Sequence, residues 1–154
     1  MKKYYIYHYN PCKLFIGEEN GAICFILFFP DKIPKDFEKG ETPLLKKAAK
    51  QLDEYFNKKR RDFDLPLVLH GTDFQIKDWK ALQKIPYGQT RSYGEIAAMI
   101  GKPKACRAVG MANNRNPICI VIPCHRVIGH DGSLTGFGGG LKLKQRLLDL
   151  EKAN

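Results

Sequence analysis

The sequence predicts an α+β protein, with a small N-terminal antiparallel sheet covered by a helix and a C-terminal, mainly helical domain containing a winged helix-turn-helix. Three observations predict this class. Runs rich in β-branched and aromatic residues dominate residues 2–29, helical spacing of apolar residues prevails after residue 69, and a polar stretch at residues 62–66 separates the two patterns. We therefore expect an N-terminal domain at residues 1–68 and a C-terminal domain at residues 69–154.

The N-terminal domain is expected to begin with three strands, at residues 2–9, 13–17 and 22–29. Asn10-Pro11 and the stretch Glu18-Glu19-Asn20-Gly21 interrupt these runs, which predicts an antiparallel meander. Residues 30–43 are polar and predict a loop that ends where Thr42 and Pro43 suit the N-cap and first turn of a helix. Six apolar residues share the helix face that would cover the sheet: Leu44, Leu45, Ala48, Leu52, Tyr55 and Phe56.

The C-terminal domain is expected to contain three closely spaced helices. Thr72 precedes a helix at residues 73–84, which must stop before Pro86. Ser92 and Glu95 form a capping-box pattern for a second helix at residues 93–100. A third helix, at residues 104–113, follows after a short turn. Two short helices at this separation are typical of a helix-turn-helix, although many helical hairpins share the pattern and bind no nucleic acid.

Small residues on the third helix indicate how it would meet DNA. Ala105, Ala108 and Gly110 allow a close approach to a groove, which fits the minor groove better than base reading in the major groove. Charge agrees with a polyanionic partner. Most of the net charge of +10 lies from Leu69 onward, where the chain has 13 lysines and arginines and 6 aspartates and glutamates. The residues before Leu69 have 13 basic and 10 acidic side chains, so the C-terminal half is the more basic one.

Composition argues against a secreted or membrane-bound protein. The cysteines form no closely spaced, even framework, no cleavable leader precedes them, and no apolar run approaches the length of a membrane span. We expect reduced thiols, a cytoplasmic location, no membrane contact and a monomer. His8, Cys12, Cys24 and His70 match no zinc spacing, so we expect neither a metal site nor a cofactor.

A reactive thiol is the central feature of the C-terminal half. Cys124 follows the apolar run at residues 118–122, expected to be extended, and precedes a glycine-rich loop. Because neighbours on an extended chain point to opposite faces, His125 would reach the thiol through a bridging water. Glu151, on the last helix, is the best-placed acid to orient the imidazole. The alternative is that Cys124 is an inert buried cysteine and His125 an ordinary loop histidine.

Three strings favour the reactive thiol. They are IPYGQTRSYGEIA at residues 85–97, RAVGMANNRNP at residues 107–117 and IPCHRVIG at residues 122–129. Together they closely resemble the O6-alkylguanine-DNA alkyltransferases, and the match covers most of the C-terminal half. The N-terminal half resembles that family only in length and in its order of strands and helix.

The resemblance implies direct repair of double-stranded DNA containing O6-alkylguanine, with O4-alkylthymine as a second candidate substrate. The alkyl group would pass to Cys124 once per molecule, after the nucleotide is flipped into a pocket. His125 and Glu151 would activate the thiol, Tyr93 would assist the leaving base and Asn116 would hold the turn before the active segment.

The resemblance also implies an interface and a pocket. Arg107 would fill the space left by the flipped nucleotide, and Tyr93 would help to rotate that nucleotide. The remaining DNA contacts would come from Lys104, Ala105, Ala108, Gly110 and Arg115. Backbone groups near Val127 and the segment Phe137, Gly138 and Gly139 would form the substrate pocket. Phe137 stands where many relatives carry tyrosine, and Gly138 replaces a serine found in some, and both differences favour tolerance of bulkier alkyl groups.

Two other functions stay open on the sequence. A related, non-repairing module binds alkylated bases, but such relatives lack the thiol that this chain has at Cys124. A cysteine hydrolase could use Cys124, His125 and a carboxylate, although the helix-turn-helix and the basic C-terminal half are unexpected for one.

Overall fold

The computed structural model describes residues 1–152, which form two compact units. The first unit comprises Met1–Leu69 together with Pro117–Cys119, and the second comprises His70–Asn116 and the chain from Ile120 onward. The predicted α+β class is confirmed. The domain boundary between residues 68 and 69 stays a prediction.

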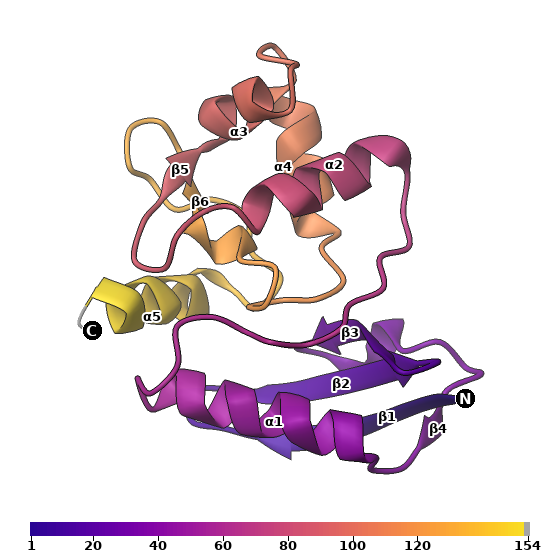
Figure 1. The fold of residues 1–154 in the computed structure, drawn as a ribbon. Coiled ribbons are helices and arrows are strands. Elements are labelled where there is room, and N and C mark those ends of the chain that lie inside the picture. Colours follow the sequence, from indigo (N-terminus) through magenta and orange to yellow (C-terminus); the bar gives the residue numbers. More distant parts are fainter. Residues whose placement is uncertain (153–154) are drawn as a thin grey trace. The chain divides into compact units, whose positions relative to one another are not determined.

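The first unit is a four-stranded sheet with one long helix against it (Figure 1). Its strands are β1 (Lys2–His8), β2 (Lys13–Glu19), β3 (Ala22–Leu27) and β4 (Glu38–Lys39), in the order β3-β2-β1-β4. The first three form the predicted antiparallel meander. β4 was missed. It pairs in parallel with the edge of β1, within the expected loop and after a 3-10 turn, η1 (Pro30–Lys32), so the sheet is mixed rather than purely antiparallel.

Helix α1 (Pro43–Phe56) covers one face of this sheet. It begins as predicted, because Thr42 accepts a hydrogen bond from Leu45 N at 3.1 Å and Pro43 occupies the first turn. Leu45, Leu52, Leu14, Ile16 and Ile26 are fully buried and form the core of the unit.

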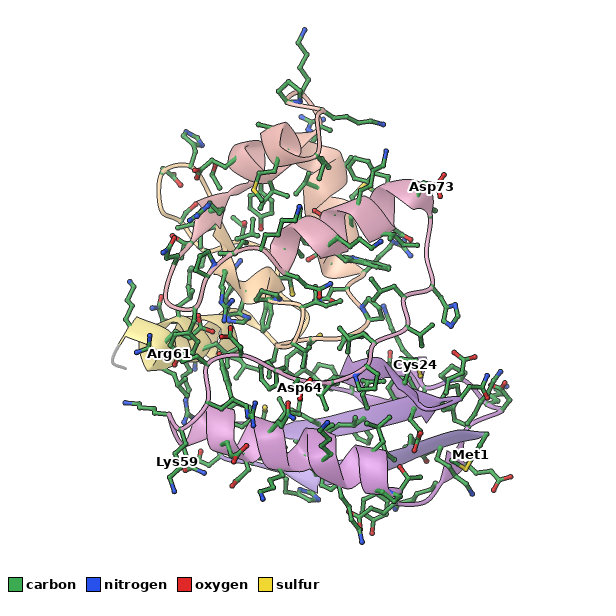
Figure 2. The ribbon with its side chains drawn as sticks, viewed as in Figure 1. Met1, Cys24, Lys59, Arg61, Asp64 and Asp73 are labelled. Carbon is green, nitrogen blue, oxygen red and sulfur yellow. The ribbon has the colours of Figure 1, made fainter. Side chains whose placement is uncertain are left out.

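A smaller apolar cluster gathers Phe15, Cys24 and Phe25. Because successive side chains of a strand point to opposite faces of the sheet, Phe15 lies on the face opposite to that of Leu14 and Ile16. Figure 2 labels Cys24 on β3 and Asp73 at the start of α2. All five cysteines are thiols outside any disulfide bond, as predicted.

In the second unit, helices α2 and α5 contact the short turn that carries Cys124. Its elements are α2 (Asp73–Leu82), β5 (Arg91–Ser92), α3 (Tyr93–Met99), α4 (Cys106–Asn114), η2 (Cys124–Arg126), β6 (Val127–Ile128) and α5 (Leu141–Lys152). Both expected caps are present: Thr72 with Gln75 opens α2, and Ser92 with Glu95 opens α3. β5 and β6 form a short parallel pair that sequence analysis did not predict. In this unit, α2, α3 and α4 contact one another (Figure 1).

Two sequence predictions after residue 100 were wrong. Helix α4 begins at Cys106 rather than at residue 104, because Ala105 N bonds Lys102 O at 2.9 Å and closes a turn around Pro103. The run at residues 118–122 is not a continuous extended strand. Ile118 makes an isolated bridge to Ile26 in the first unit, and Ile120 adopts a left-handed conformation with φ 72°.

No helix within residues 1–152 is long and apolar enough to cross a membrane. The same residues contain no cluster of three or more histidine, cysteine, aspartate or glutamate side chains suited to a metal ion.

Candidate active site

Cys124 opens a short 3-10 turn rather than lying on an extended strand. Its backbone N–H donates to Ile122 O at 2.8 Å, and Arg126 N donates to Pro123 O at 3.0 Å, which closes η2. The side chain of Asn116 donates to Ile122 O at 2.8 Å and also hydrogen-bonds the thiol. Asn116 therefore secures the turn that precedes Cys124, the position that the family resemblance implies for it. Only 8% of Cys124 is exposed.

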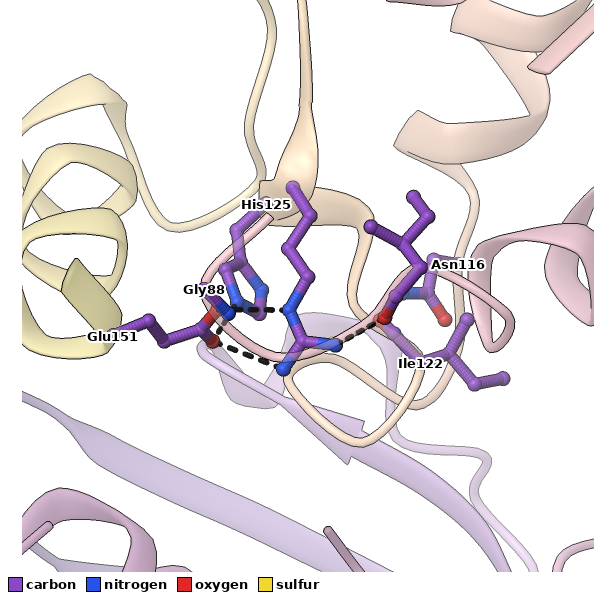
Figure 3. Close-up of polar contacts among 7 residues, drawn as sticks. Gly88, Asn116, Ile122, His125 and Glu151 are labelled. Atoms are coloured by element: carbon purple, nitrogen blue, oxygen red, sulfur yellow. Dashed lines mark hydrogen bonds and ion pairs between the residues drawn. The ribbon is translucent and has the colours of Figure 1, made fainter. Parts of the chain in front are cut away.

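His125 and Glu151 meet in the buried interior of the second unit (Figure 3). Nε2 of His125 lies 2.7 Å from Oε2 of Glu151. Arg126 completes the cluster, since its Nε donates to Oε1 of Glu151 at 2.8 Å and its Nη2 to Oε2 at 3.2 Å. Gly88 N donates to Oε1 at 3.2 Å. The structure thus brings α5 to the turn that carries the thiol, and three neighbours fix the Glu151 carboxylate.

Charges around Glu151 decide which imidazole nitrogen carries the proton. Burial alone would raise the pKa of Glu151, but His125 and Arg126 outweigh it and lower that pKa to about 2. Burial lowers the pKa of His125, which favours the neutral ring. Because an ionised carboxylate only accepts, Nε2 must donate and Nδ1 must bear a lone pair. Within the described residues, Nδ1 has no hydrogen-bond partner.

The resting thiol of Cys124 is protonated at neutral pH. Burial raises its pKa to about 11. The hydrogen bond from Asn116 and the charge of Lys144 act in the opposite direction, whereas the charge of Asp78 raises the pKa further. Reaction at Cys124 therefore requires a proton acceptor, and the bare Nδ1 of the neighbouring His125 is chemically suited to that task.

Lys144 is a fully buried lysine that sequence analysis overlooked. Its Nζ donates to the backbone oxygen of Thr135 at 2.8 Å. The hydroxyl oxygens of Thr135 and Tyr93 lie 2.8 Å apart. Thr135 thereby links α5 to the start of α3, next to the glycine-rich loop. Burial lowers the pKa of Lys144, as expected for an ammonium group removed from water.

The residues expected at the DNA interface lie on or beside α4. Arg107, on α4, and Arg115, its C-cap, are exposed, as is Lys104 in the turn before the helix. The N-cap Ala105 is half-buried, as are Ala108 and Gly110 on the helix. A Cβ at Gly110 would lie 3.8 Å from the ring of Tyr93, so the two residues are neighbours. Met111, which sequence analysis did not single out, is 63% exposed on the same helix.

The expected pocket residues differ in exposure. Val127 is fully buried on β6, Phe137 and Gly139 are half-buried, and Gly138 is exposed. A Cβ at Gly138 would meet no atom within 4 Å. A Cβ at Gly136 would lie 3.1 Å from Oδ1 of Asn114, which places this loop against the end of α4.

Sequence reasoning missed three further members of the site. Arg126 stands inside the PCHRV string, and its position beside His125 was the available signal. Lys144 sits among exposed lysines on α5, and Asp78 follows Lys77 on α2, so neither stood out. Only their burial in the folded chain distinguishes them.

Known proteins match both halves of the chain. A family model described as the DNA-binding domain of 6-O-methylguanine DNA methyltransferase matches residues 73–153. A second model, the ribonuclease-like domain of the same family, matches residues 4–69. The N-terminal half is therefore similar to the family in more than length and order of elements.

Individual relatives agree with the family models. A methylated-DNA–protein-cysteine methyltransferase from Methanosarcina barkeri is 58% identical over 123 residues, which cover 80% of this chain and 77% of the relative. The crystal structure of Mycobacterium tuberculosis OGT in complex with DNA superposes with a TM-score of 0.93 at 44% identity, covering 98% of this chain and 93% of that one. The chain belongs to the 6-O-methylguanine DNA methyltransferase family.

Proposed function

We propose that this protein repairs DNA by moving an alkyl group from O6 of guanine to the sulfur of Cys124. The observation that carries the proposal is the buried arrangement in which Cys124 adjoins His125, and Nε2 of His125 lies 2.7 Å from the Glu151 carboxylate. That arrangement supplies a nucleophile, a base with a bare nitrogen and an acid that orients the base. Two relatives support the proposal: one is named a methylated-DNA–protein-cysteine methyltransferase, and the other, an OGT, has a crystal structure in complex with DNA.

The reaction begins when the thiol proton of Cys124 passes, through a bridging water, to Nδ1 of His125. The negative charge of Glu151 stabilises the resulting imidazolium. The sulfur then forms a bond to the alkyl carbon while the bond from that carbon to O6 breaks. The electron pair leaves with guanine, and a hydrogen bond from the hydroxyl of Tyr93 stabilises the developing charge on the base.

Each molecule acts once in this scheme. The product is an S-alkylcysteine, a thioether without a carbonyl that water could attack. The protein is then a single-turnover enzyme whose repair capacity equals the number of protein molecules. No cofactor takes part in these steps.

Double-stranded DNA containing O6-alkylguanine is the proposed substrate, and a monomer the proposed active form. A base inside the stack cannot be reached in line by the thiol, so the nucleotide must be turned outward. The half-buried Ala108 and Gly110 allow α4 a close approach to the minor groove, and exposed Arg107 is free to fill the vacated space. Val127 and the loop of Phe137, Gly138 and Gly139 would then enclose the base. O4-alkylthymine is the second substrate that we propose for the same pocket.

Intact-mass spectrometry with a duplex containing one O6-methylguanine tests the proposal. We expect one added methyl group per protein, located by peptide mapping on the peptide that contains Cys124. Cys124→Ser should gain no mass, whereas the matched control Cys12→Ser, on the first unit, should react like the unchanged protein.

Two outcomes would favour the other functions. Tight binding of the damaged duplex without any gain in mass would favour a non-repairing, damage-binding module. Sustained turnover of ester or amide substrates through Cys124 would favour a cysteine hydrolase.

A further inference from the structure

A second buried acid, Asp78, has no part in the mechanism above and lies on α2, the helix that contacts the η2 turn carrying Cys124. Asp78 faces inward from α2 and is 0% exposed. Its partner is Asn113 on α4. With the amide nitrogen turned toward the carboxylate, Nδ2 of Asn113 lies 3.2 and 2.5 Å from the two oxygens and 3.2 Å from Val109 O. A buried carboxyl costs stability unless its surroundings compensate it, so a functional role for Asp78 is worth testing.

The position of Asp78 connects it to both the thiol and α4. Helix α2 packs against η2, which carries Cys124, and against α4. Beside Asp78, Trp79 donates from Nε1 to Ala112 O at 2.9 Å. Asp78 and Trp79 of α2 therefore contact Asn113 and Ala112 in the last turn of α4. Shortly after this turn the chain reaches Asn116, which hydrogen-bonds the thiol of Cys124.

The charges around Asp78 leave its own charge unbalanced. Helix α4 contributes the neutral Asn113, and η2 contributes Cys124. Within residues 1–152, Asp78 makes no ion pair, and α3 places no charged group on it. The thiol of Cys124, in contrast, is subject to charges of both signs: the positive charge of Lys144 on α5 and the negative charge of Asp78 on α2. The two charges act on the thiol in opposite directions.

Protonation of Asp78 would change this balance near neutral pH. Burial raises the pKa of Asp78 to about 7. The ionised carboxylate disfavours a thiolate at Cys124, whereas the neutral acid does not. The amide of Asn113 can donate to either form, so the tether between α2 and α4 survives the change.

We infer that Asp78 is a positioning residue that restrains the reactivity of Cys124, holding α4 through Asn113 while its negative charge opposes formation of the thiolate. The inference rests on the proposed alkyl transfer at Cys124. It predicts that neutralising Asp78 without changing its shape makes the thiol more reactive. The restraint would also relax in the unchanged protein when the carboxyl binds a proton.

The test compares Asp78→Asn with the unchanged protein in two reactions at Cys124. The first is labelling by iodoacetamide, followed by mass spectrometry without DNA, and the second is single-turnover methyl transfer from a duplex containing O6-methylguanine. Asn is isosteric and can still pair with Asn113. At pH 8 we expect both rates to rise at least about threefold, because removing a nearby negative charge lowers the thiol pKa. The matched control is Asp73→Asn, an exposed acid on the same helix, which should change neither rate.

The pH profile separates this role from a merely structural one. For the unchanged protein, the logarithm of the labelling rate should rise with a slope below one between pH 6 and 8, because Asp78 gains charge over that range. Asp78→Asn should restore a slope near one. Equal slopes and equal rates in the two proteins would overturn the inference.

Carboxyl NMR of the unchanged protein covers the case in which Asp78→Asn does not fold. A titration of Asp78 near pH 7 would support the inference, and one below about pH 5 would overturn it. The two proposals remain distinguishable. Faster iodoacetamide labelling without methyl transfer would contradict the proposed function alone, and normal methyl transfer with unchanged pH profiles would contradict the inference alone.

Discussion

Nε2 of His125 lies 2.7 Å from Oε2 of Glu151, and both side chains are almost completely buried. The same carboxylate accepts two hydrogen bonds from Arg126 and one from Gly88 N. Glu151 therefore holds the imidazole in one orientation while neutralising part of the charge of a buried guanidinium. One residue of α5 serves both the chemistry of the thiol and the stability of the turn that carries it.

Glu151→Gln should slow methyl transfer and destabilise the protein. The amide leaves Arg126 without its anionic partner, which should cost on the order of 3 kcal/mol in the free energy of unfolding. It also removes the charge that stabilises the imidazolium, so the single-turnover rate should fall by roughly ten- to a hundredfold. Chemical denaturation and rapid-quench kinetics at a temperature where the variant stays folded measure the two effects separately.

Asp149→Asn is the matched control for Glu151→Gln. Asp149 is exposed on the same helix, where it accepts a hydrogen bond from Gln145 at 2.8 Å. We expect a change within about 0.5 kcal/mol and an unchanged rate. If Glu151→Gln transferred methyl groups as fast as the control, Glu151 would have no part in activating His125.

Acid should destabilise the protein in two stages. Burial lowers the pKa of His125 in the folded chain, so below about pH 6.5 the unfolded chain binds a proton that the folded chain resists, and stability falls as pH drops. Glu151 has a folded pKa of about 2 against an ordinary value of 4.5, so its contribution is present above pH 4.5 and is lost as pH falls toward 2.

Thermal unfolding between pH 8 and about pH 2 checks the two stages. The Tm should decline from pH 7 to 5 and decline again below pH 4.5. His125→Asn should lose the first decline, whereas His130→Gln, at an exposed loop position, should keep it. A Tm that stays constant from pH 7 to 5 would contradict the assignment of a neutral, buried His125.

Much of the fold could be predicted because local signals and packing agree. Thr42 and Ser92 cap their helices as their side chains suggest, and Asn20-Gly21 forms the hairpin turn with both φ angles positive. The short β4 could not be predicted, because two residues carry no periodicity and their pairing with β1 depends on the path of the whole loop.

The candidate site could be predicted only in part. The PCHRV string predicts Cys124 and His125, and the position of Glu151 on the last predicted helix makes it the candidate acid. Lys144 and Asp78 have the same residue types as many surface positions. Nothing in their local sequence indicates that tertiary packing buries them, so their opposing charges on the thiol emerge only from the folded second unit.

Lys144→Met should make Cys124 less reactive without unfolding the protein. The ammonium of Lys144 lowers the pKa of the thiol, and its removal leaves the charge of Asp78 unopposed. We expect labelling by iodoacetamide at pH 7 to slow by roughly tenfold, which corresponds to one unit of thiol pKa. Lys142→Met, an exposed neighbour on α5, should label at the unchanged rate. Equal rates for the two variants would show that Lys144 acts through packing alone.

Gly17→Ala should destabilise the first unit, because the sheet leaves no room for a side chain at this position. A Cβ at Gly17 would lie 2.2 Å from Cε2 of Phe25, closer than any real contact. The ring of Phe25 cannot move freely, since it is 95% buried and packs against Phe37 with a centroid separation of 5.1 Å. Overpacking of this kind costs about 1–3 kcal/mol.

Thermal unfolding should show a lower Tm for Gly17→Ala, whereas Gly138→Ala, where a Cβ meets no atom within 4 Å, should unfold at nearly the unchanged temperature. Equal Tm values for both variants would mean that β2 and β3 shift apart at the bulge between Gly17 and Glu18 at little cost.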